Sequence, residues 1–335
     1  MTSEARGIEM NQIELELKIA ANGRDPIAMS ATQPGLSYLQ TAHGVIAYER
    51  AYGSALSLGG PICAAEHEVE LANEFLRKVR GASLFYVPDA IALADHGRYR
   101  ASLGCDRVLD LDRADTFDAA PVKAAVRKAA KAGLKLSELD FERASDFDLF
   151  DLARINEAAL KKSVVPFEMR FLNRPMHPSP ALSRLFFLEA RNERFGYAVL
   201  DPYFESGQVK GYLLNLIRFG PTSIWGVYMA VVHALAAQLR EEGVRELSLG
   251  FCPMSELDLE NTSPVLRPQL KWLAKQAEGA EYFKRLREMK GQFNGRWVRR
   301  WLVTRSPQLV TPLLSFLKLT GVPVGSWLRE QLGIA

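Results

Sequence analysis

Arg218 closes an apolar stretch, GYLLNLIRF, and stands directly before a Gly-Pro break and a helical pattern. The first turn of a helix leaves backbone N–H groups without partners inside the helix, and these groups attract anions. A guanidinium beside that turn adds a positive charge suited to a phosphate. The spacing therefore predicts an anion-binding loop after Arg218, although its glycines fit neither a P-loop nor a dinucleotide fingerprint.

Acidic and hydroxyl side chains follow a second apolar stretch, SLGFC, where a strand would end. Ser255, Glu256 and Asp258 lie there, and a carboxylate in such a place can serve as a general base or line a polar pocket. Asn215 lies three residues before Arg218, an odd offset that puts the two side chains on opposite faces of an ideal strand. Both reach one site only if a β-bulge or a strand end intervenes.

Residues 281–305 carry most of the charge asymmetry of the chain. The whole chain has a net charge of +3, whereas this segment has eight basic residues against two acidic ones. Lys290 lies in this basic run, and Trp297 and Trp301 are interleaved with it. The pattern suits contacts to nucleotide phosphates, with stacking on the tryptophans, or attraction to an anionic membrane surface. A solvated helix end is the plain structural alternative.

Several other kinds of site are not supported. The histidines lack the mutual spacing of a metal site, His233 fits a packed helix position, and no serine stands in a GxSxG turn. Cys63, Cys105 and Cys252 have no C-x-x-C spacing, which argues against disulfides and zinc and favours a reducing cytoplasm. The N-terminus lacks the bases of a signal peptide, and no stretch reaches 18 apolar residues. We expect a protein that is soluble or at most peripheral on a membrane.

The composition is that of a folded chain, with 335 residues of which 48% are hydrophobic, and the length favours two domains. Strands are expected around a turn at Tyr52–Gly53, then a helix at 64–79 and a strand at SLFYVP. The same order returns as the strands around FGYAVLDPYF and GYLLNLIRF, the helix VYMAVVHALAAQLREEG and a parallel strand VRELSLGF. A helix at 268–290 and a strand at RWVRRWLV follow.

The order of hairpin, break, helix and strand thus occurs twice, at 44–87 and 195–250. This is the core order of GNAT-like acyltransferases. We expect an α+β fold of two tandem GNAT-like domains, each a mixed, largely antiparallel sheet flanked by helices. The expected division is a polar arm at 1–30, a first domain at 31–145, a second domain with the active site at 146–305, and an apolar segment at 306–335.

Four segments in order resemble the cytosolic C-terminal synthase domain of the lysyl-phosphatidylglycerol (aminoacyl-phosphatidylglycerol) synthases. They are GVIAYERAYGSALSLGGP, LGCDRVLDLD with VRKAAKAGLKL, GYLLNLIRFGPTSIWGVYMAVVHALAAQLREEGVRELSLGFCPMSEL, and MKGQFNGRW. The resemblance runs over residues 35–305 and includes the family's Phe-Lys-x-x-Phe-x-x-x-Trp ending through Lys290, Phe293 and Trp297.

The resemblance implies two GNAT-like folds around a tunnel, which aminoacyl-tRNA enters on one side and a lipid head group on the other. A lipid hydroxyl would attack the aminoacyl carbonyl, without a metal or a covalent enzyme intermediate. The chain departs from the family at Asn215 and Cys105, where acidic residues are usual, and over residues 163–180. A carboxylate that recognises the ammonium of the donor is therefore in question, and a fatty acyl donor would not need one.

The resemblance also assigns roles to residues. Lys290 would stabilise an oxyanion or a donor phosphate, and the expected catalytic residues are Arg218, Lys290, Asn215 and Glu256. The expected donor-binding residues are Gly220, Thr222, Ser223, Trp225, Gly226, Lys284 and Arg287. The expected lipid contacts are Tyr212, Tyr228, Phe293 and Trp297. No metal or bound cofactor is expected, because the acyl donor is a cosubstrate: aminoacyl-tRNA, acyl-CoA or acyl carrier protein.

The function implied is aminoacyl-tRNA-dependent aminoacylation of phosphatidylglycerol. The main alternative is an N-acyltransferase that forms a ceramide-type amide lipid from a long-chain acyl thioester. A non-catalytic lipid- or tRNA-binding module is a third reading, against which the retention of Arg218 and Lys290 argues. The expected partners are the lipid and an anionic membrane surface, with tRNA or acyl carrier protein as donor and no DNA.

The membrane-spanning flippase half of the family is absent from the sequence, so the protein is expected on the inner face of the cell membrane. The segment from Pro307 is expected either to anchor at that interface or to pack on the domain.

Overall fold

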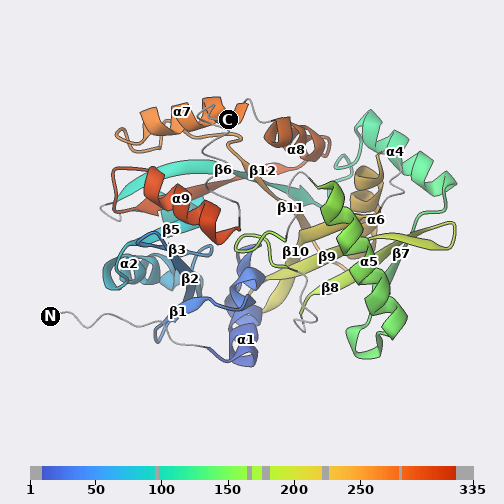
Figure 1. The fold of residues 1–335 in the computed structure, drawn as a ribbon, viewed down its shortest axis with the longest axis horizontal. Helices are drawn as coiled ribbons and strands as arrows, with labels where there is room; N and C mark the ends of the chain where they lie inside the picture. The colour runs from blue at the N-terminus through green and yellow to red at the C-terminus, as the bar shows by residue number, and fades with distance from the viewer. Residues whose placement is uncertain are drawn as a thin grey trace.

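The computed structural model describes residues 10–94, 98–163, 168–175, 182–220, 226–278 and 281–321. One continuous twelve-stranded mixed sheet runs through the molecule, with helices packed around it (Figure 1). Its strand order is β1-β2-β3-β5-β12-β6-β11-β10-β9-β8-β7, and β4 pairs with β2 off this path. The strands are β1 (Ser37–Gln40), β2 (Gly44–Ala51), β3 (Ser54–Ser57), β4 (Ile62–Cys63), β5 (Ala82–Val87), β6 (Tyr99–Asp110), β7 (Lys135–Leu139), β8 (Arg184–Ala190), β9 (Glu193–Glu205), β10 (Gln208–Phe219), β11 (Glu246–Pro253) and β12 (Arg296–Thr304).

The helices cover both halves of this sheet. They are α1 (Gln12–Asn22), α2 (Glu68–Lys78), α3 (Asp89–Ala92), α4 (Ala120–Lys131), α5 (Asp146–Lys162), α6 (Val227–Glu241), α7 (Arg267–Glu278), α8 (Glu281–Gly291) and α9 (Val310–Leu319), with 3-10 turns η1 (Ala28–Thr32), η2 (Ala65–His67) and η3 (Phe141–Arg143). The single helix expected at 268–290 is therefore divided between α7 and α8.

The predicted duplication is confirmed by the strand pairing. In the first unit the hairpin β2–β3 is followed by α2 and by β5, which runs parallel to β3. In the second unit β9–β10 is followed by α6 and by β11, which runs parallel to β10. Tyr52 and Gly53 both have positive φ, the conformation that a tight two-residue hairpin turn requires. Each unit is thus the strand–helix–strand core of a GNAT-like fold.

The two units exchange strands, which the sequence did not predict. β12 comes from the segment expected in the second domain, yet it lies between β5 and β6 of the first and is antiparallel to both. β7 comes from the segment expected in the first domain, yet it pairs with β8 at the far edge. The boundary expected at 145 therefore crosses a sheet whose strands are shared.

The segment expected as a polar arm at 1–30 forms a packed helix in its described part, and the stretch IELELKI within that helix also offered a short helix or strand from the sequence. α1 buries Leu15 and Ile19, which stand four residues apart on one helix face and join the core of the first unit. After the helix, the N–H of Phe204 in β9 donates to the carbonyl of Gly23. The polar residues of this amphipathic helix outnumber its buried ones, so the composition of the segment does not show its apolar stripe.

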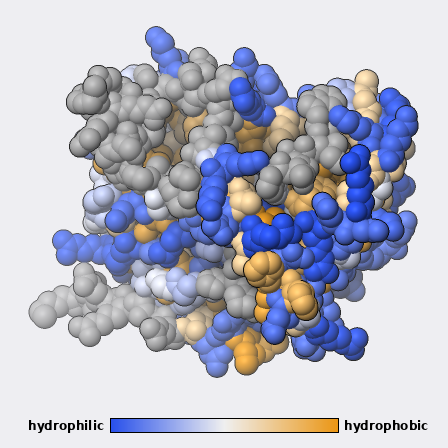
Figure 2. All heavy atoms as spheres, turned by 45° about the vertical axis from the view of Figure 1, so that its right-hand side comes forward, coloured by the Kyte–Doolittle hydropathy of each residue, from blue (hydrophilic) through white to orange (hydrophobic). Residues whose placement is uncertain are grey.

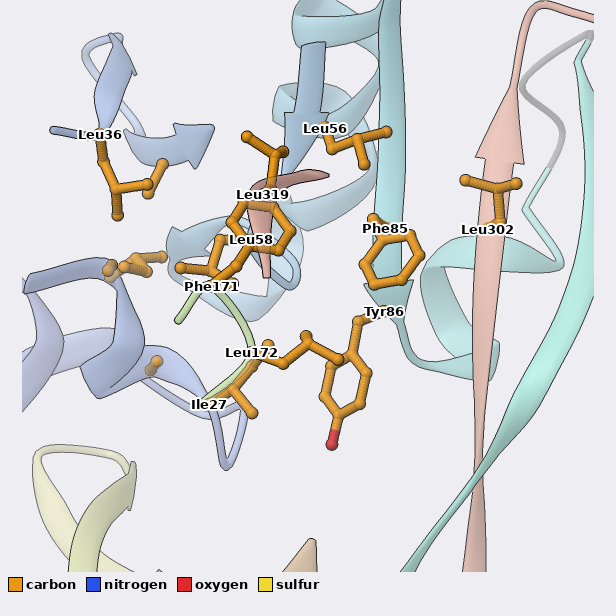
Figure 3. Packing of buried hydrophobic residues seen from close by; sticks show 14 of the residues in the cluster. Ile27, Leu36, Leu56, Leu58, Phe85, Tyr86, Phe171, Leu172, Leu302 and Leu319 are labelled. Carbon is orange, nitrogen blue, oxygen red and sulfur yellow. The ribbon is translucent and has the colours of Figure 1, made fainter. Parts of the chain in front are cut away.

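Residues 168–175 connect the two units through the largest core. Phe171 lies near Leu58, Phe85 and Leu319 (Figure 3). Gln33 holds the Phe171 backbone from the first unit: its Oε1 accepts from the N–H at 2.9 Å, and its Nε2 donates to the carbonyl at 2.6 Å. Residues 168–175 are thus held to the first unit.

The start of the C-terminal segment packs on the domain. Leu309 and Leu319 of this segment are buried, and Phe316 of α9 stacks on Phe85 with ring centroids 4.6 Å apart. The packing alternative thus describes residues 309–319, and the predicted anchor beyond residue 321 lies outside the described residues. No helix in the described part of the chain is long and apolar enough to cross a membrane.

The surface of the second unit is mostly hydrophilic where β7 and α5 come forward, with apolar side chains gathered low in the view (Figure 2). The start of α5 exposes Phe147 and Phe150, whereas Leu152 and Ile155 of the same helix are buried against the sheet. α5 itself begins at a capping box between Ser145 and Asp148.

Candidate functional site

β10 and β11 pair only at their beginnings and then separate. Their parallel pairing covers Gly211–Leu213 and Glu246–Ser248, although β10 continues to Phe219 and β11 to Pro253. Gly250 adopts a φ of +75° near this point, and a Cβ there would lie 3.3 Å from Leu213 Cδ1 and 3.8 Å from Lys290 Nζ. The ammonium of Lys290 therefore lies where the two strands part.

Lys290 is a buried cation held by a backbone carbonyl. Its side chain comes from the last turn of α8 and donates to the carbonyl of Phe251 at 3.0 Å. Burial lowers the pKa of the ammonium, and the nearby Cys252 and Asp106 only partly oppose that effect. A desolvated ammonium with spare donor hydrogens is the kind of group that stabilises a developing oxyanion.

A buried charged cluster lies behind Phe251, and the sequence analysis missed it. Arg300, in β12, binds Asp106 at 2.7 Å and Asp25 at 2.8 Å, and its guanidinium lies 4.5 Å from the Tyr86 ring centroid. The Tyr86 hydroxyl donates to Asp106, and its ring meets Phe251 edge-on. The insertion of β12 into the first unit thus helps to hold β11, whose Phe251 carbonyl accepts the hydrogen bond from Lys290.

A cavity of about 560 Å³ opens at the end of β11. It is lined by residues from β11 and its end, α7, α8 and β12, among them Glu256, Phe283, Lys284, Arg287 and Trp297. Glu256 forms an ion pair with Arg287. The structure therefore brings together four residues that the sequence assigned to the site: Glu256, Lys284, Arg287 and Trp297.

The basic run is largely compensated by acidic partners. Arg296 pairs with Glu246, Arg299 with Asp258, and Arg300 with Asp106 and Asp25. Lys284 and Arg287 are the two members that line the cavity. The acids that pair with Arg296, Arg299 and Arg300 thus come from other parts of the sequence and offset part of the positive charge of the run.

Arg218 lies in a second cluster, at the far end of β10. Its Nη2 donates to Glu168 Oε2 at 3.2 Å, and Glu168 Oε1 accepts from the side-chain amide of Asn156 at 2.8 Å. Asn156 Oδ1 in turn accepts from the Tyr197 hydroxyl at 2.7 Å, and Arg218 Nε is buried without a hydrogen-bond partner among the described residues. The sequence analysis missed Glu168, because its segment is irregular and stands 50 residues before Arg218.

Asn215 occupies the β-bulge that its offset from Arg218 required. The pairing of β10 with β9 shifts register between Leu214 and Leu216, which leaves Asn215 as the extra residue. Its side chain is only 5% exposed and binds the backbone of Arg174. After the bulge, Leu216 and Arg218 face α5, where Asn156 lies. Asn215 thus shapes the strand, and its catalytic role stays a prediction.

The remaining predicted residues lie in or next to β10, α6, α8 and β12. Tyr212 and Phe293 are buried in the second core, Tyr228 lies beside Phe293 with ring centroids 6.3 Å apart, and the Arg107 guanidinium lies 4.5 Å from the Trp297 ring centroid. Gly220 follows β10, and Gly226, with a φ of +77°, precedes α6. Thr222, Ser223 and Trp225 lie outside the described residues.

His233 and the cysteines fit the sequence expectation of inert side chains. Burial lowers the pKa of His233, whose ring meets Phe117 edge-on. The three cysteines are free and buried. Cys105 and Cys252 nevertheless face each other in register on β6 and β11, although they are 147 positions apart. Burial raises the pKa of both thiols.

Comparison with known proteins identifies the fold and the family. The family model of the phosphatidylglycerol lysyltransferase C-terminal domain matches residues 18–304. The chain belongs to this family. A search of curated proteins finds no match. As a member of the lysyltransferase family, the chain is a transferase of the aminoacyl or acyl class with a GNAT-like fold.

Solved structures agree in fold with this assignment. L-PGS from Bacillus licheniformis is 16% identical, with a TM-score of 0.76 over 94% of this chain and 98% of that chain. The C-terminal domain of a putative lysylphosphatidylglycerol synthetase from Agrobacterium fabrum is 18% identical, with a TM-score of 0.73 over 93% and 99%. A conserved protein of unknown function from Bacteroides thetaiotaomicron is 10% identical, with a TM-score of 0.58 over 90% and 99%.

Proposed function

We propose that this chain moves an aminoacyl group from aminoacyl-tRNA to the head group of phosphatidylglycerol at a membrane surface. Family membership supplies the class of reaction. The single observation that carries the choice of donor is the carboxylate of Glu168 beside Arg218. A plain fatty acyl group has no ammonium for such a carboxylate to recognise.

Glu168 supplies the charge that Asn215 lacks. Asn215 stands where an acid is usual, which left an acyl thioester donor as the main alternative. Its side-chain amide is occupied by the Arg174 backbone. Glu168 comes from another segment of the chain and lies beside Arg218, at the end of β10 that also carries Asn215. Its side chain is 29% exposed. Each carboxylate oxygen of Glu168 accepts one hydrogen bond and can accept one more. An anion beside a guanidinium suits a donor with an ammonium next to a polar carbonyl.

The cavity at the end of β11 suits the nucleotide end of the donor. Lys284 and Arg287 place positive charge on its wall, and Trp297 offers an aromatic face. Cations that meet phosphates and aromatic rings that stack on bases are the usual means of binding single-stranded nucleic acid. A volume of about 560 Å³ accommodates a terminal nucleoside, so the body of a tRNA would stay outside.

In the proposed reaction, the lipid hydroxyl oxygen attacks the aminoacyl carbonyl carbon, and the bond to the ribose oxygen breaks. The hydroxyl proton leaves during attack, and the ribose oxygen takes up a proton as it departs. In this proposal Lys290 stabilises negative charge on the carbonyl oxygen. Glu256, a carboxylate that lines the cavity, accepts the hydroxyl proton and passes it to the departing ribose oxygen.

The membrane contact is proposed on α7 instead of the basic run. Trp272 is 53% exposed there between the exposed Lys271 and Lys275, and Ala274 of the same helix lines the cavity. Gln269 binds the backbone of Leu309, which places the exposed Val310 at the same helix. Apolar insertion beside lysines is the combination that holds a protein reversibly on an anionic bilayer. The inner face of the cell membrane is the proposed location.

The test is a transfer assay with both donors and both acceptors. Aminoacyl-tRNA and a long-chain acyl-CoA are each offered with phosphatidylglycerol or sphingoid-base vesicles, and the products are read by mass spectrometry. Aminoacyl-phosphatidylglycerol from the tRNA donor supports the proposal. An amide lipid from acyl-CoA, with no aminoacyl ester, overturns it in favour of N-acyl transfer.

Membrane binding is tested by sedimentation with anionic and neutral vesicles. Trp272→Ala should reduce binding to anionic vesicles, whereas Phe147→Ala, an exposed aromatic on α5, should leave it unchanged. Equal sedimentation with neutral and anionic vesicles would contradict the assignment of α7.

A further inference from the structure

Three potential metal ligands gather at one place on the first unit. His43 lies in the turn between β1 and β2, His67 ends η2, and Glu70 lies in the first turn of α2. Within the described ranges this is the one group of its kind, and its ligand atoms all lie within 4.8 Å of one another. Sequence patterns do not reveal this group, because His43 and His67 are distant in the chain and belong to no spaced motif.

The short strand β4 holds the two histidines together. Gly44 and Val45 pair with Cys63 and Ile62, so the residue after His43 is fixed against the strand that leads to His67. Gly44 permits this approach, since a Cβ there would lie 2.3 Å from the Ile62 carbonyl oxygen. The positions of both histidines thus follow from backbone pairing.

Hydrogen bonds fix the two local turns as well. The N–H of His43 donates to Thr41 Oγ1 at 3.2 Å, and the N–H of Thr41 donates to the Gly44 carbonyl at 2.9 Å. The N–H of His67 donates to the carbonyl of Ala64 at 3.0 Å, which closes the 3-10 turn. Glu70 follows His67 by three residues and therefore shares its helical face.

The side-chain geometry is close to that of a metal centre. Two ligands of a tetrahedral Zn²⁺ lie about 3.3 Å apart, since each bond is about 2.0–2.1 Å. His67 Nδ1 and Glu70 Oε2 are separated by 3.5 Å. The rings of His43 and His67 have centroids 4.0 Å apart and an angle of 32° between their planes. The ligand atoms already lie within 4.8 Å of one another, so rotation of the side chains alone would bring them to the separations of a metal site. His43 and Glu70 are exposed.

We propose that His43, His67 and Glu70 bind one late first-row divalent cation, Zn²⁺ above all, which joins the β1–β2 turn to the start of α2. Two imidazoles and a carboxylate suit Zn²⁺, whereas Mg²⁺ and Ca²⁺ prefer all-oxygen sites. Three protein ligands leave one tetrahedral position to water. β2 is five strands from β11, about 24 Å, so this cation is a structural clip remote from the transfer site.

Calorimetric titration of the untagged, metal-free full chain with Zn²⁺ tests the proposal. We expect one equivalent to bind, loss of that binding in His43→Ala/His67→Ala, and at least tenfold weaker binding in Glu70→Gln. Glu66→Gln changes an exposed glutamate of the same turn and should bind as the unchanged chain does. Saturating Zn²⁺ should also raise the melting temperature of the unchanged chain by several degrees, because the cation binds the folded state.

Two readouts keep this test independent of folding and of activity. The metal-free double variant should melt at the same temperature as the unchanged chain, because the ion-pair and ring contacts that it loses among the described residues are those within the three ligands. Co²⁺ in place of Zn²⁺ should give intense visible bands from a four-coordinate site, and these bands should vanish in the double variant. Zn²⁺ binding or stabilisation that survives in the double variant overturns the proposal, and so does a lack of uptake by the unchanged chain.

Discussion

Asn215 binds both polar groups of the Arg174 backbone with the two ends of its side-chain amide. Nδ2 donates to the Arg174 carbonyl at 2.8 Å, and Oδ1 accepts from the Arg174 N–H at 3.2 Å. The Arg174 guanidinium is itself buried on Asp201 at 2.6 Å. One amide thus joins the bulge of β10 to the segment that supplies Glu168.

The first prediction concerns this amide. Asn215→Asp restores the acid usual in the family, yet it removes the donor to the Arg174 carbonyl and buries a carboxylate. We expect it to lower the free energy of unfolding by about 1–3 kcal/mol without any gain in transfer. Denaturant unfolding and kcat/KM measure the two effects. A rise in kcat/KM would show that residue 215 faces the donor.

The second prediction concerns recognition of the donor ammonium. Glu168→Gln keeps the size of the side chain and removes its charge, so kcat/KM for aminoacyl-tRNA should fall about 10- to 100-fold, or about 1.4–2.7 kcal/mol. Arg218→Ala should cost about as much as the loss of an oxyanion donor, 2.7–4 kcal/mol. Glu157→Gln, an exposed glutamate of α5 paired with Lys161, is the control. If Glu168→Gln leaves kcat/KM unchanged for a donor without an ammonium, the assignment is strengthened. Equal losses of kcat/KM for the charged and the uncharged donor would refute it.

The third prediction follows from the lowered pKa of Lys290. Lys290→Met should abolish most transfer while the melting temperature stays at or above that of the unchanged chain, because a buried cation is costly. The pKa of Lys290 in the folded state lies below its value near 10.5 in the unfolded state. Between these two pKa values, only the unfolded state binds the proton. This group should therefore make stability rise with pH there, while transfer that needs the cation falls. A melting temperature well below that of the unchanged chain would assign Lys290 a structural role.

The fourth prediction concerns the cavity wall. If Lys284 and Arg287 contact donor phosphates, the affinity for tRNA should fall as salt rises, and each alanine variant should lower that salt slope by about one. Lys123→Ala, on α4 and paired with Asp118, should leave the slope unchanged. Filter binding over a salt series measures both. Identical slopes in all the variants would place the tRNA elsewhere.

The fifth prediction concerns the thiols. Burial raises the pKa of Cys63 to about 12 and that of Cys105 further still, so neither thiolate forms near neutral pH. A soluble aromatic disulfide reagent should label none of the three cysteines in the native chain at pH 8 and all three after denaturation. Rapid native labelling would indicate that β6 and β11 open at Cys105 and Cys252.

Local patterns were enough to predict the repeated unit. The hairpin at Tyr52–Gly53, the α6 helix and the parallel β11 all follow from alternation, helical periodicity and turn residues close together in the chain. The family resemblance was enough to predict the fold class, and it singled out Lys290 and Trp297 as candidate site residues. These features depend on short-range physics or on motifs that survive sequence divergence.

What escaped prediction depends on pairing between distant segments. Glu168 meets Arg218 only because residues 168–175 are pinned from the first unit through Gln33 and Phe171. The ion pairs of the basic run also escaped prediction, since its acidic partners, such as Glu246 and Asp106, come from other strands. A charge sum along the chain cannot show that neutralisation.

The insertion of β12 between β5 and β6 dictates when the chain can fold. Thr304 pairs with Ser83, 221 residues earlier, and their hydroxyls bond at 3.0 Å. During synthesis, the edges of β5 and β6 stay unpaired until residue 304 has left the ribosome. Such high contact order implies slow folding, with these strand edges exposed until β12 is in place. A truncation before β12 would leave the first unit open at its centre and prone to association through those edges.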